Sequence, residues 1–182
     1  SAKIAGDFLN GLPAQNPFGA KIFGRIITNP KKTAASGMNA GFRAATGDIF
    51  IIISAHAYMS SDFIKENLAC LKEGADAAGG LVLSAPDSPS FLARVIGYAL
   101  NTRFALGGIT ARTGGTKRLM NNPSFGAYRR ELFDKFGYFN EELIRNSDYV
   151  YNLHIVKNGA KILFSPDIKS YYFNRSSLTA LF

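Results

Sequence analysis

The sequence predicts an α/β fold in which helices cover both faces of a sheet, within one domain of 182 residues. Helix-like and strand-like segments alternate through the first half of the chain, as in three-layer folds. Residues 48–54 form a nearly unbroken apolar run, which is typical of a strand buried on both faces. The apolar content of 47% and the charged content of 19% are ordinary for a packed core and exclude an intrinsically disordered chain.

Glycine, proline and helix-capping residues bound the expected elements of the first half. We expect helices over residues 2–12, 34–45 and 61–73, and strands over residues 25–28, 48–54 and 77–83. The apolar run at 48–54 lacks the alternation of a strand with one solvated face. We therefore expect it to be a central, parallel strand.

The second half is expected to continue with helices and short strands around one long loop. Ser88-Pro89 is a typical helix start, and it opens a helix that runs to about residue 106. Residues 107–122 contain two glycine pairs and no periodicity, and they are expected to form a mobile, functional loop. The remaining expected elements are strands at 124–128, 161–164 and 169–173, and helices from 130 and over 147–157.

The net charge of +8 is high for this length. It indicates a phosphorylated substrate, an anionic membrane or a nucleic acid as partner, or else a basic surface that is only solvated. No nucleic-acid-binding motif accompanies the charge, so no nucleic-acid partner is expected. Cys70 is the only cysteine, lies in an apolar helical pattern and is expected to be a buried thiol. No apolar run approaches the roughly 18 residues that cross a bilayer.

Two sets of polar residues are candidates for a site. Ser54 and His56 follow the buried strand and point to the same side of an extended segment, where they could face a phosphate or a metal. His56 could equally cap the next helix. Asp148 begins a helix, where a carboxylate is stabilised, and it could be functional or a simple helix cap.

Two adjacent arginines form a third candidate. Arg129 and Arg130 follow the strand that ends in Phe125-Gly126-Ala127-Tyr128. They could bind a phosphate through paired N–H groups, or one could be solvated while the other pairs with Glu131 or Asp134.

Several motifs in order resemble the family 2 glycosyltransferases, which have the GT-A fold. The chain is similar in particular to the bacterial exopolysaccharide glucosyltransferases that include the succinoglycan enzymes. The resemblance extends from about residue 22 to the end. The motifs are Asn29-Pro30, the Ala35–Asp48 stretch with its glycines, Ser54-Ala55-His56, Pro123–Phe133, Gly137–Leu143 and Arg145-Asn146-Ser147-Asp148 with Asn152.

The resemblance implies a three-layer GT-A mixed sheet that lacks its first β-α-β elements, roughly 40 or 50 residues judged from usual unit lengths. It places an incomplete nucleotide-sugar half first and an acceptor half from about residue 107. The implied catalytic base is Asp148. The residues implied to bind the nucleotide sugar and its phosphates are Asn39, Ser54, His56, Lys117 and Arg129, and those on the acceptor side are Phe125, Gly126 and Tyr149.

The implied cofactor is Mn²⁺ or Mg²⁺ with His56 as a ligand. Ser54, however, stands where relatives have an aspartate, and a hydroxyl is a poor ligand for a hard cation. Tyr149, Val150 and Tyr151 stand where relatives have acidic residues. The basic loop with Arg112, Lys117 and Arg118 is expected to close over the phosphates.

The function implied is sugar transfer, with inversion, from a UDP-sugar or related donor to a glycan or lipid-linked acceptor of a surface polysaccharide. The protein would then be cytoplasmic and peripheral at the inner face of the membrane, whose anionic lipids attract basic surfaces. The alternative, which the changes at Ser54 and Tyr149–Tyr151 favour, is a non-catalytic relative that serves as a binding or scaffold domain.

Overall fold

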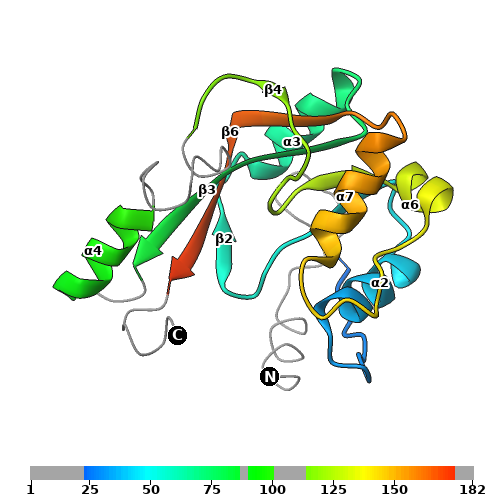
Figure 1. Ribbon diagram of the computed structural model, residues 1–182, viewed down its shortest axis with the longest axis horizontal. Coiled ribbons are helices and arrows are strands. Elements are labelled where there is room, and N and C mark those ends of the chain that lie inside the picture. The colour runs from blue at the N-terminus through cyan, green and yellow to red at the C-terminus, as the bar shows by residue number, and fades with distance from the viewer. Residues whose placement is uncertain (1–22, 87–89, 101–113, 175–182) are drawn as a thin grey trace.

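The computed structural model describes residues 23–86, 90–100 and 114–174, and these form three layers. A six-stranded mixed sheet lies between two helical layers, with α2, α6 and α7 on one face and α3 on the other (Figure 1). The predicted α/β three-layer architecture is therefore confirmed.

The strands of the sheet have the order β1-β5-β3-β6-β2, and β4 pairs with the start of β6. Their bounds are β1 Ile49–Ile51, β2 Ala57–Met59, β3 Ala77–Pro86, β4 Arg118–Leu119, β5 Ala127–Arg129 and β6 Ile162–Asn174. β3 and β6 run parallel over ten residue pairs, whereas every other pairing is antiparallel. A register shift between Gly80 and Leu81 marks a β-bulge in the long parallel ladder.

The helices are α2 Ala34–Ala44, α3 Phe63–Lys72, α4 Phe91–Leu100, α6 Arg130–Phe136 and α7 Ser147–Lys157. The helices expected over 34–45, 61–73 and 147–157 and from 130 are present. Thr33 caps α2, because its hydroxyl accepts a hydrogen bond from the Ser36 amide at 3.2 Å. The expected helix at 2–12 and the helix start at Ser88-Pro89 lie outside the described residues.

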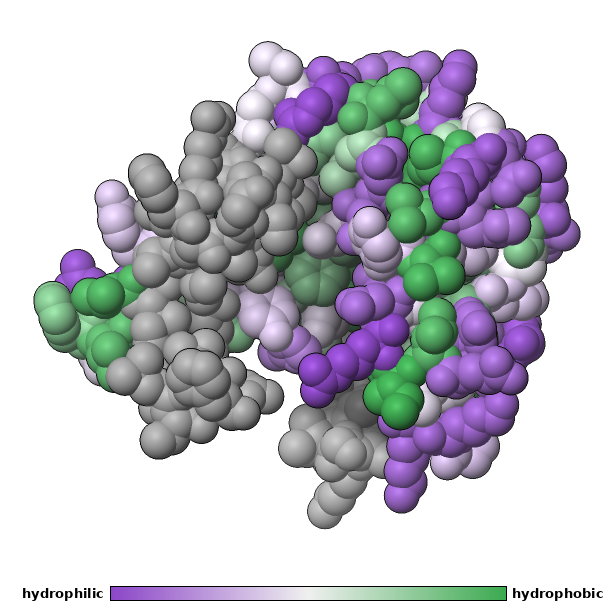
Figure 2. Space-filling model, in the orientation of Figure 1, coloured by the Kyte–Doolittle hydropathy of each residue, from purple (hydrophilic) through white to green (hydrophobic). Residues whose placement is uncertain are grey.

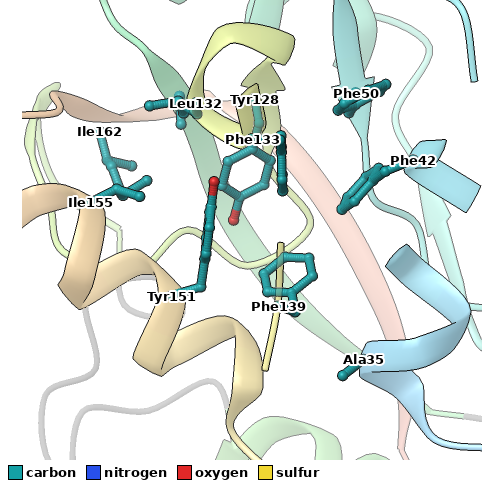
Figure 3. Packing of buried hydrophobic residues seen from close by; sticks show 11 residues of the cluster. Ala35, Phe42, Phe50, Tyr128, Leu132, Phe133, Phe139, Tyr151, Ile155 and Ile162 are labelled. Carbon is teal, nitrogen blue, oxygen red and sulfur yellow. The ribbon is translucent and has the colours of Figure 1, made fainter. Parts of the chain in front are cut away.

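Successive strand residues face the two helical layers in turn. Ala77 and its cross-strand partner Tyr128 point to α2, α6 and α7, whereas Ala78 and its partner Ala127 point to α3. An aromatic cluster fills the first interface, and in it the rings of Phe133 and Tyr151 stack with centroids 5.2 Å apart (Figure 3). Because Phe133 is on α6 and Tyr151 is on α7, this contact packs the two helices against each other.

Two strand predictions were wrong in the first half of the chain. Residues 48–54 contribute β1, which is antiparallel to β5 and lies at the end of the described strand order. Both faces of β1 are apolar because a helical layer covers each face. Such coverage occurs with antiparallel as well as with parallel neighbouring strands. Residues 25–28 form no strand; their side chains are exposed, so no packing supports the β propensity of Ile26 and Ile27.

The strand boundaries also differ in the second half. The two strands expected at 161–164 and 169–173 are one strand, β6, because the segment at Pro166 is absorbed in the bulge rather than breaking the ladder. Gly80 allows this, since a Cβ there would collide with the Ile168 carbonyl oxygen. The expected loop at 107–122 contains β4, and its residues 107–113, including Arg112, lie outside the described part. β2 was not predicted.

Candidate functional site

A cavity of about 600 Å³ opens between the first helical layer and one end of the sheet. Four segments far apart in the sequence line it: residues 33–38 at the start of α2, residues 52–54 after β1, residues 123–126 before β5, and residues 144–148 at the start of α7. The N-termini of two helices thus face one space. Helix N-termini carry unpaired N–H groups and a partial positive charge, which favours an anionic ligand.

Ser54, three residues after the end of β1, lines this cavity. Its Oγ lies 3.2 Å from Nδ1 of the exposed His56 imidazole, and the His56 ring packs edge-on against Tyr172 with centroids 4.7 Å apart. His56 does not line the cavity itself, but its imidazole contacts Ser54, which does. The expected pair is therefore close together, but only Ser54 faces the space.

Asp148 lines the same cavity from the first turn of α7. Its carboxylate is exposed and has no hydrogen bond or ion pair within the described residues. Asn146, which precedes α7, has a left-handed backbone with φ of 59° and makes no side-chain cap. Asp148 is therefore not held as a helix cap, and it stays available to a ligand.

The wall opposite is a strained and tightly packed turn. Phe125 has a φ of 50°, a conformation that bulky residues rarely adopt. The Gly126 carbonyl accepts the Ile52 amide at 3.2 Å, which ties this turn to the end of β1. Phe125 and Gly126, both expected on the acceptor side, line the cavity.

Tyr128 closes the inner end of the cavity. Burial, together with the negative charge of Asp148, raises the pKa of its hydroxyl well above the ordinary value, although a hydrogen bond with Asn152 acts in the opposite direction. The hydroxyl is therefore neutral at physiological pH and presents a hydrogen-bonding group rather than a charge.

Besides His56, four residues expected in the site do not line the cavity. Lys117 pairs with Glu73 at 2.6 Å, and the Arg129 guanidinium donates to the carbonyls of Leu71 at 2.7 Å and Ala75 at 3.1 Å. Asn39 is buried, where it donates to the Phe139 carbonyl and accepts from the Phe139 amide. Tyr149 is half-exposed and does not line the cavity. The first three have these protein partners in the structure, and none of the four lines the cavity.

Arg145 is the cationic residue that lines the cavity. It was not among the expected site residues, although it stands three positions before Asp148. No periodic pattern marks it, because it belongs to the loop that leads into α7. Asn29, Thr33 and Ser124 also line the cavity and were not expected there; Asn29 is held by hydrogen bonds to the Thr33 carbonyl and the Ser36 hydroxyl.

The residues of the cavity do not fit a chelated divalent cation. Hard cations prefer several carboxylate oxygens, and the part of the lining that the structure describes offers one carboxylate, that of Asp148. At the end of β1 a neutral hydroxyl, Ser54, accompanies a single imidazole. Over residues 23–86, 90–100 and 114–174 no three His, Cys, Asp or Glu side chains gather as a metal site. No described helix is long and apolar enough to span a bilayer.

A family model described as glycosyl transferase family 2 matches residues 19–137. A Methanococcus voltae protein, dolichyl N-acetyl-alpha-D-glucosaminyl phosphate 3-beta-D-2,3-diacetamido-2,3-dideoxy-beta-D-glucuronosyltransferase, is 30% identical over 85% of this chain and 49% of its own length. The succinoglycan biosynthesis protein ExoA of Rhizobium meliloti is 24% identical over 86% of this chain and 48% of its own length. The chain thus spans about half the length of both relatives.

Solved structures share the fold. That of S. aureus TarS residues 1–349 in complex with UDP-GlcNAc matches with a TM-score of 0.61 and 18% identity, over 97% of this chain and 46% of that one. GalNAc-T7 with UDP, GalNAc and Mn²⁺ matches with a TM-score of 0.54 and 16% identity, over 79% of this chain and 31% of that one.

Proposed function

The chain belongs to glycosyl transferase family 2, and on that premise we propose that its cavity binds a nucleotide-diphosphate sugar, such as a UDP-sugar. The sugar is transferred, with inversion, to a glycan or lipid-linked acceptor of a cell-surface polysaccharide. Relatives named for surface-polysaccharide synthesis and for transfer to a dolichyl-linked sugar support this acceptor class.

The observation that carries the proposal is that Ser54 and Asp148 line the same cavity. They come from different elements, the end of β1 and the first turn of α7, and the sheet and the aromatic core hold those elements together. The volume of about 600 Å³ lies within the range of about 300–1,000 Å³ that is usual for small-molecule sites. Two helix N-termini provide a favourable environment for a diphosphate.

The reaction assigned to this cavity is a displacement at the anomeric carbon. The acceptor hydroxyl attacks from the face opposite the diphosphate, and its proton passes to the carboxylate of Asp148. The bond between the anomeric carbon and the phosphate oxygen breaks, and its electron pair leaves with the nucleoside diphosphate. Asp148 suits the role of base because no described residue neutralises or hydrogen-bonds its carboxylate.

The structure weakens the argument for a non-catalytic relative. Tyr151 is buried in the aromatic core, and Tyr149 and Val150 are each 47% exposed and do not line the cavity. Positions 149–151, where relatives have acidic residues, therefore do not lie on the cavity wall, and the absence of acidic residues there leaves the wall unaltered. Of the departures from the family pattern at Ser54 and Tyr149–Tyr151, the one at Ser54 lies on the cavity wall.

Replacing the proposed base tests the assignment. We expect Asp148→Asn in the full-length protein to lower the transfer rate about 10²- to 10⁴-fold, because the amide cannot accept the proton. Donor affinity should change little, and product formation from a radiolabelled UDP-sugar measures both quantities. The matched control is Asp134→Asn, an exposed aspartate on α6 outside the cavity, which should leave the rate unaltered. An unaltered rate in Asp148→Asn would disprove the base assignment.

A further inference from the structure

Sugar transfer creates a negatively charged leaving group, and some positive charge in the site must meet it. Among the described residues that line this cavity, Asp148 is the single carboxylate, and Ser54 presents a neutral hydroxyl. Such a donor set does not chelate Mn²⁺ or Mg²⁺ firmly. Beyond the partial charge of the two helix N-termini, positive charge then has to come from a side chain, and the described lining of the cavity contains one cationic residue, Arg145.

The Arg145 guanidinium is exposed, and it has no hydrogen bond, ion pair or ring contact within the described part of the chain. Its neighbour Asp148 is not within ion-pair distance, since no salt bridge joins them. The guanidinium is thus free to turn into the cavity when an anion arrives.

Most other described arginines already have partners. The guanidinium groups of Arg25, Arg118, Arg129 and Arg130 donate to backbone carbonyls, and that of Arg43 pairs with Glu141. Arg94, on α4, lies outside the cavity. A free guanidinium at the mouth of an apolar and hydroxyl-lined cavity is therefore a particular feature of position 145.

We infer that Arg145, in place of a chelated divalent cation, binds the diphosphate of the nucleotide sugar, so that donor binding is independent of metal. This inference rests on the proposed function. A guanidinium can donate two parallel N–H bonds to phosphate oxygens, which fixes the diphosphate as well as neutralising it. As the bond to the anomeric carbon breaks, the electron pair stays on the phosphate oxygen that Arg145 contacts, while the acceptor proton moves to Asp148.

The first test is calorimetric binding of UDP and of uridine to the full-length protein in EDTA and in Mn²⁺. We expect UDP affinity to agree within about 2-fold between the two conditions. Arg145→Gln should weaken UDP binding about 10- to 100-fold, which is the usual range for a lost charge-assisted bond, and leave uridine binding unchanged. Arg94→Gln, the same change outside the cavity, should leave both affinities unchanged.

The second test restores the missing ligand. Ser54→Asp would place a carboxylate beside the His56 imidazole, which lies 3.2 Å from the present hydroxyl. We expect this variant to bind Mn²⁺ in the presence of UDP, seen by electron paramagnetic resonance, and to bind UDP more tightly in Mn²⁺ than in EDTA. If the variant gains no Mn²⁺ dependence, the serine is not the reason for metal independence.

The outcomes separate this inference from the function that it assumes. Sugar transfer that stops in EDTA, or UDP binding that is unchanged in Arg145→Gln, overturns the role of Arg145 and leaves the transferase proposal intact. A protein that binds neither UDP nor uridine and transfers no sugar overturns the proposed function itself.

Discussion

Gly126 occupies a position in the cavity wall at which no side chain fits. A Cβ at this residue would lie 2.6 Å from the Ala78 carbonyl oxygen and 3.0 Å from Cβ of Pro123. The backbone of β3 cannot retreat easily, because β3 is paired on both sides with β5 and β6.

We therefore expect Gly126→Ala to destabilise the protein by about 1–3 kcal/mol and to weaken UDP binding, because the turn must shift into the cavity. Urea unfolding and calorimetry measure the two effects. Gly41→Ala is the control. A Cβ at Gly41 meets nothing within 4 Å inside α2, so this change should stabilise by up to about 1 kcal/mol. Equal effects from both changes would contradict the steric explanation.

The lowered carboxyl pKa of Glu141 leads to a second prediction at the residue scale. Hydrogen bonds from Lys31 and Asn39 lower the pKa of its carboxyl to about 2 from the ordinary value near 4.5, and the charge of Arg43 adds to the effect. A carboxyl whose pKa is lower in the folded state than in the unfolded state stabilises the fold at pH values above the unfolded-state pKa. That stabilisation is lost as the pH falls through the folded-state pKa.

Between about pH 5 and pH 2, we expect the stability of the protein to fall with acidification, and Glu141→Gln to make that fall shallower. Urea midpoints measured across this range test the expectation. Glu142→Gln is the control, because Glu142 is exposed and no salt bridge to its carboxylate is present among the described residues. Parallel pH profiles for Glu141→Gln and the parent would refute the linkage.

At the scale of elements, α7 connects the core to the cavity. Its inner face contributes Ile155, which is fully buried, while Val150 is 47% exposed on the other side. Figure 2 shows apolar residues among the polar surface along α7. Apolar residues therefore occur on both the buried and the exposed side of α7.

Truncating the buried Ile155 side chain should weaken the packing of α7 against the core. We expect Ile155→Ala to destabilise by about 2–5 kcal/mol, because it leaves a cavity against β6 and α6. Val150→Ala removes a similar aliphatic group from the exposed side and should change stability by less than about 1 kcal/mol. Thermal unfolding compares them, and a larger loss in Val150→Ala would show that the outer face of α7 is covered.

Helix positions were predictable because caps and spacing are local properties. The helices expected over residues 34–45 and 147–157 agree with α2 and α7, although Asn146 makes no side-chain cap for α7. The direction of β1 was not predictable from the sequence. An apolar strand between two helical layers has the same sequence pattern in a parallel and in an antiparallel ladder. The continuity of β6 depended on β3 accepting a bulge, which is also a distant property.

The same distinction explains the site. Ser54 and Asp148 belong to motifs that resemble a family, and the structure places both on one cavity. Arg129 was assigned to phosphate, but its partners are carbonyls 54 and 58 positions earlier in the chain, and no local pattern reveals them. Arg145 belongs to one of the motifs that resemble the family, but it was given no role, because a loop residue has no periodicity that could mark it.

At the scale of the whole molecule, the net charge of +8 and the exposed apolar residues of α4 suggest attraction to a membrane surface. Phe91 is 82% exposed and Tyr98 is 77% exposed, and Arg94 lies between them on the same helix. Exposed aromatic and basic residues together are typical of helices that lie in a lipid interface.

We expect the full-length protein to float with anionic liposomes at low salt and to be released at high salt, because each well-placed Lys or Arg contributes about 1 kcal/mol that ions screen. The double change Phe91→Ser and Tyr98→Ser should reduce flotation without affecting UDP binding, because α4 lies outside the cavity. Neutral liposomes serve as the control. Protein that stays at the bottom of the gradient with anionic vesicles at low salt would count against this localisation.

The parallel pairing of β3 with β6 has a consequence for biosynthesis. Ala77 aligns with Ile162, so the ladder forms only after 85 further residues have left the ribosome, and those residues include Arg145 and Asp148. Contacts of such long sequence separation form slowly. A nascent or prematurely terminated chain that ends before β6 would contain every side chain assigned here to chemistry, yet it would lack the strand against which α3 and β4 pack, and we expect it to be handled by chaperones and proteases rather than to bind a substrate.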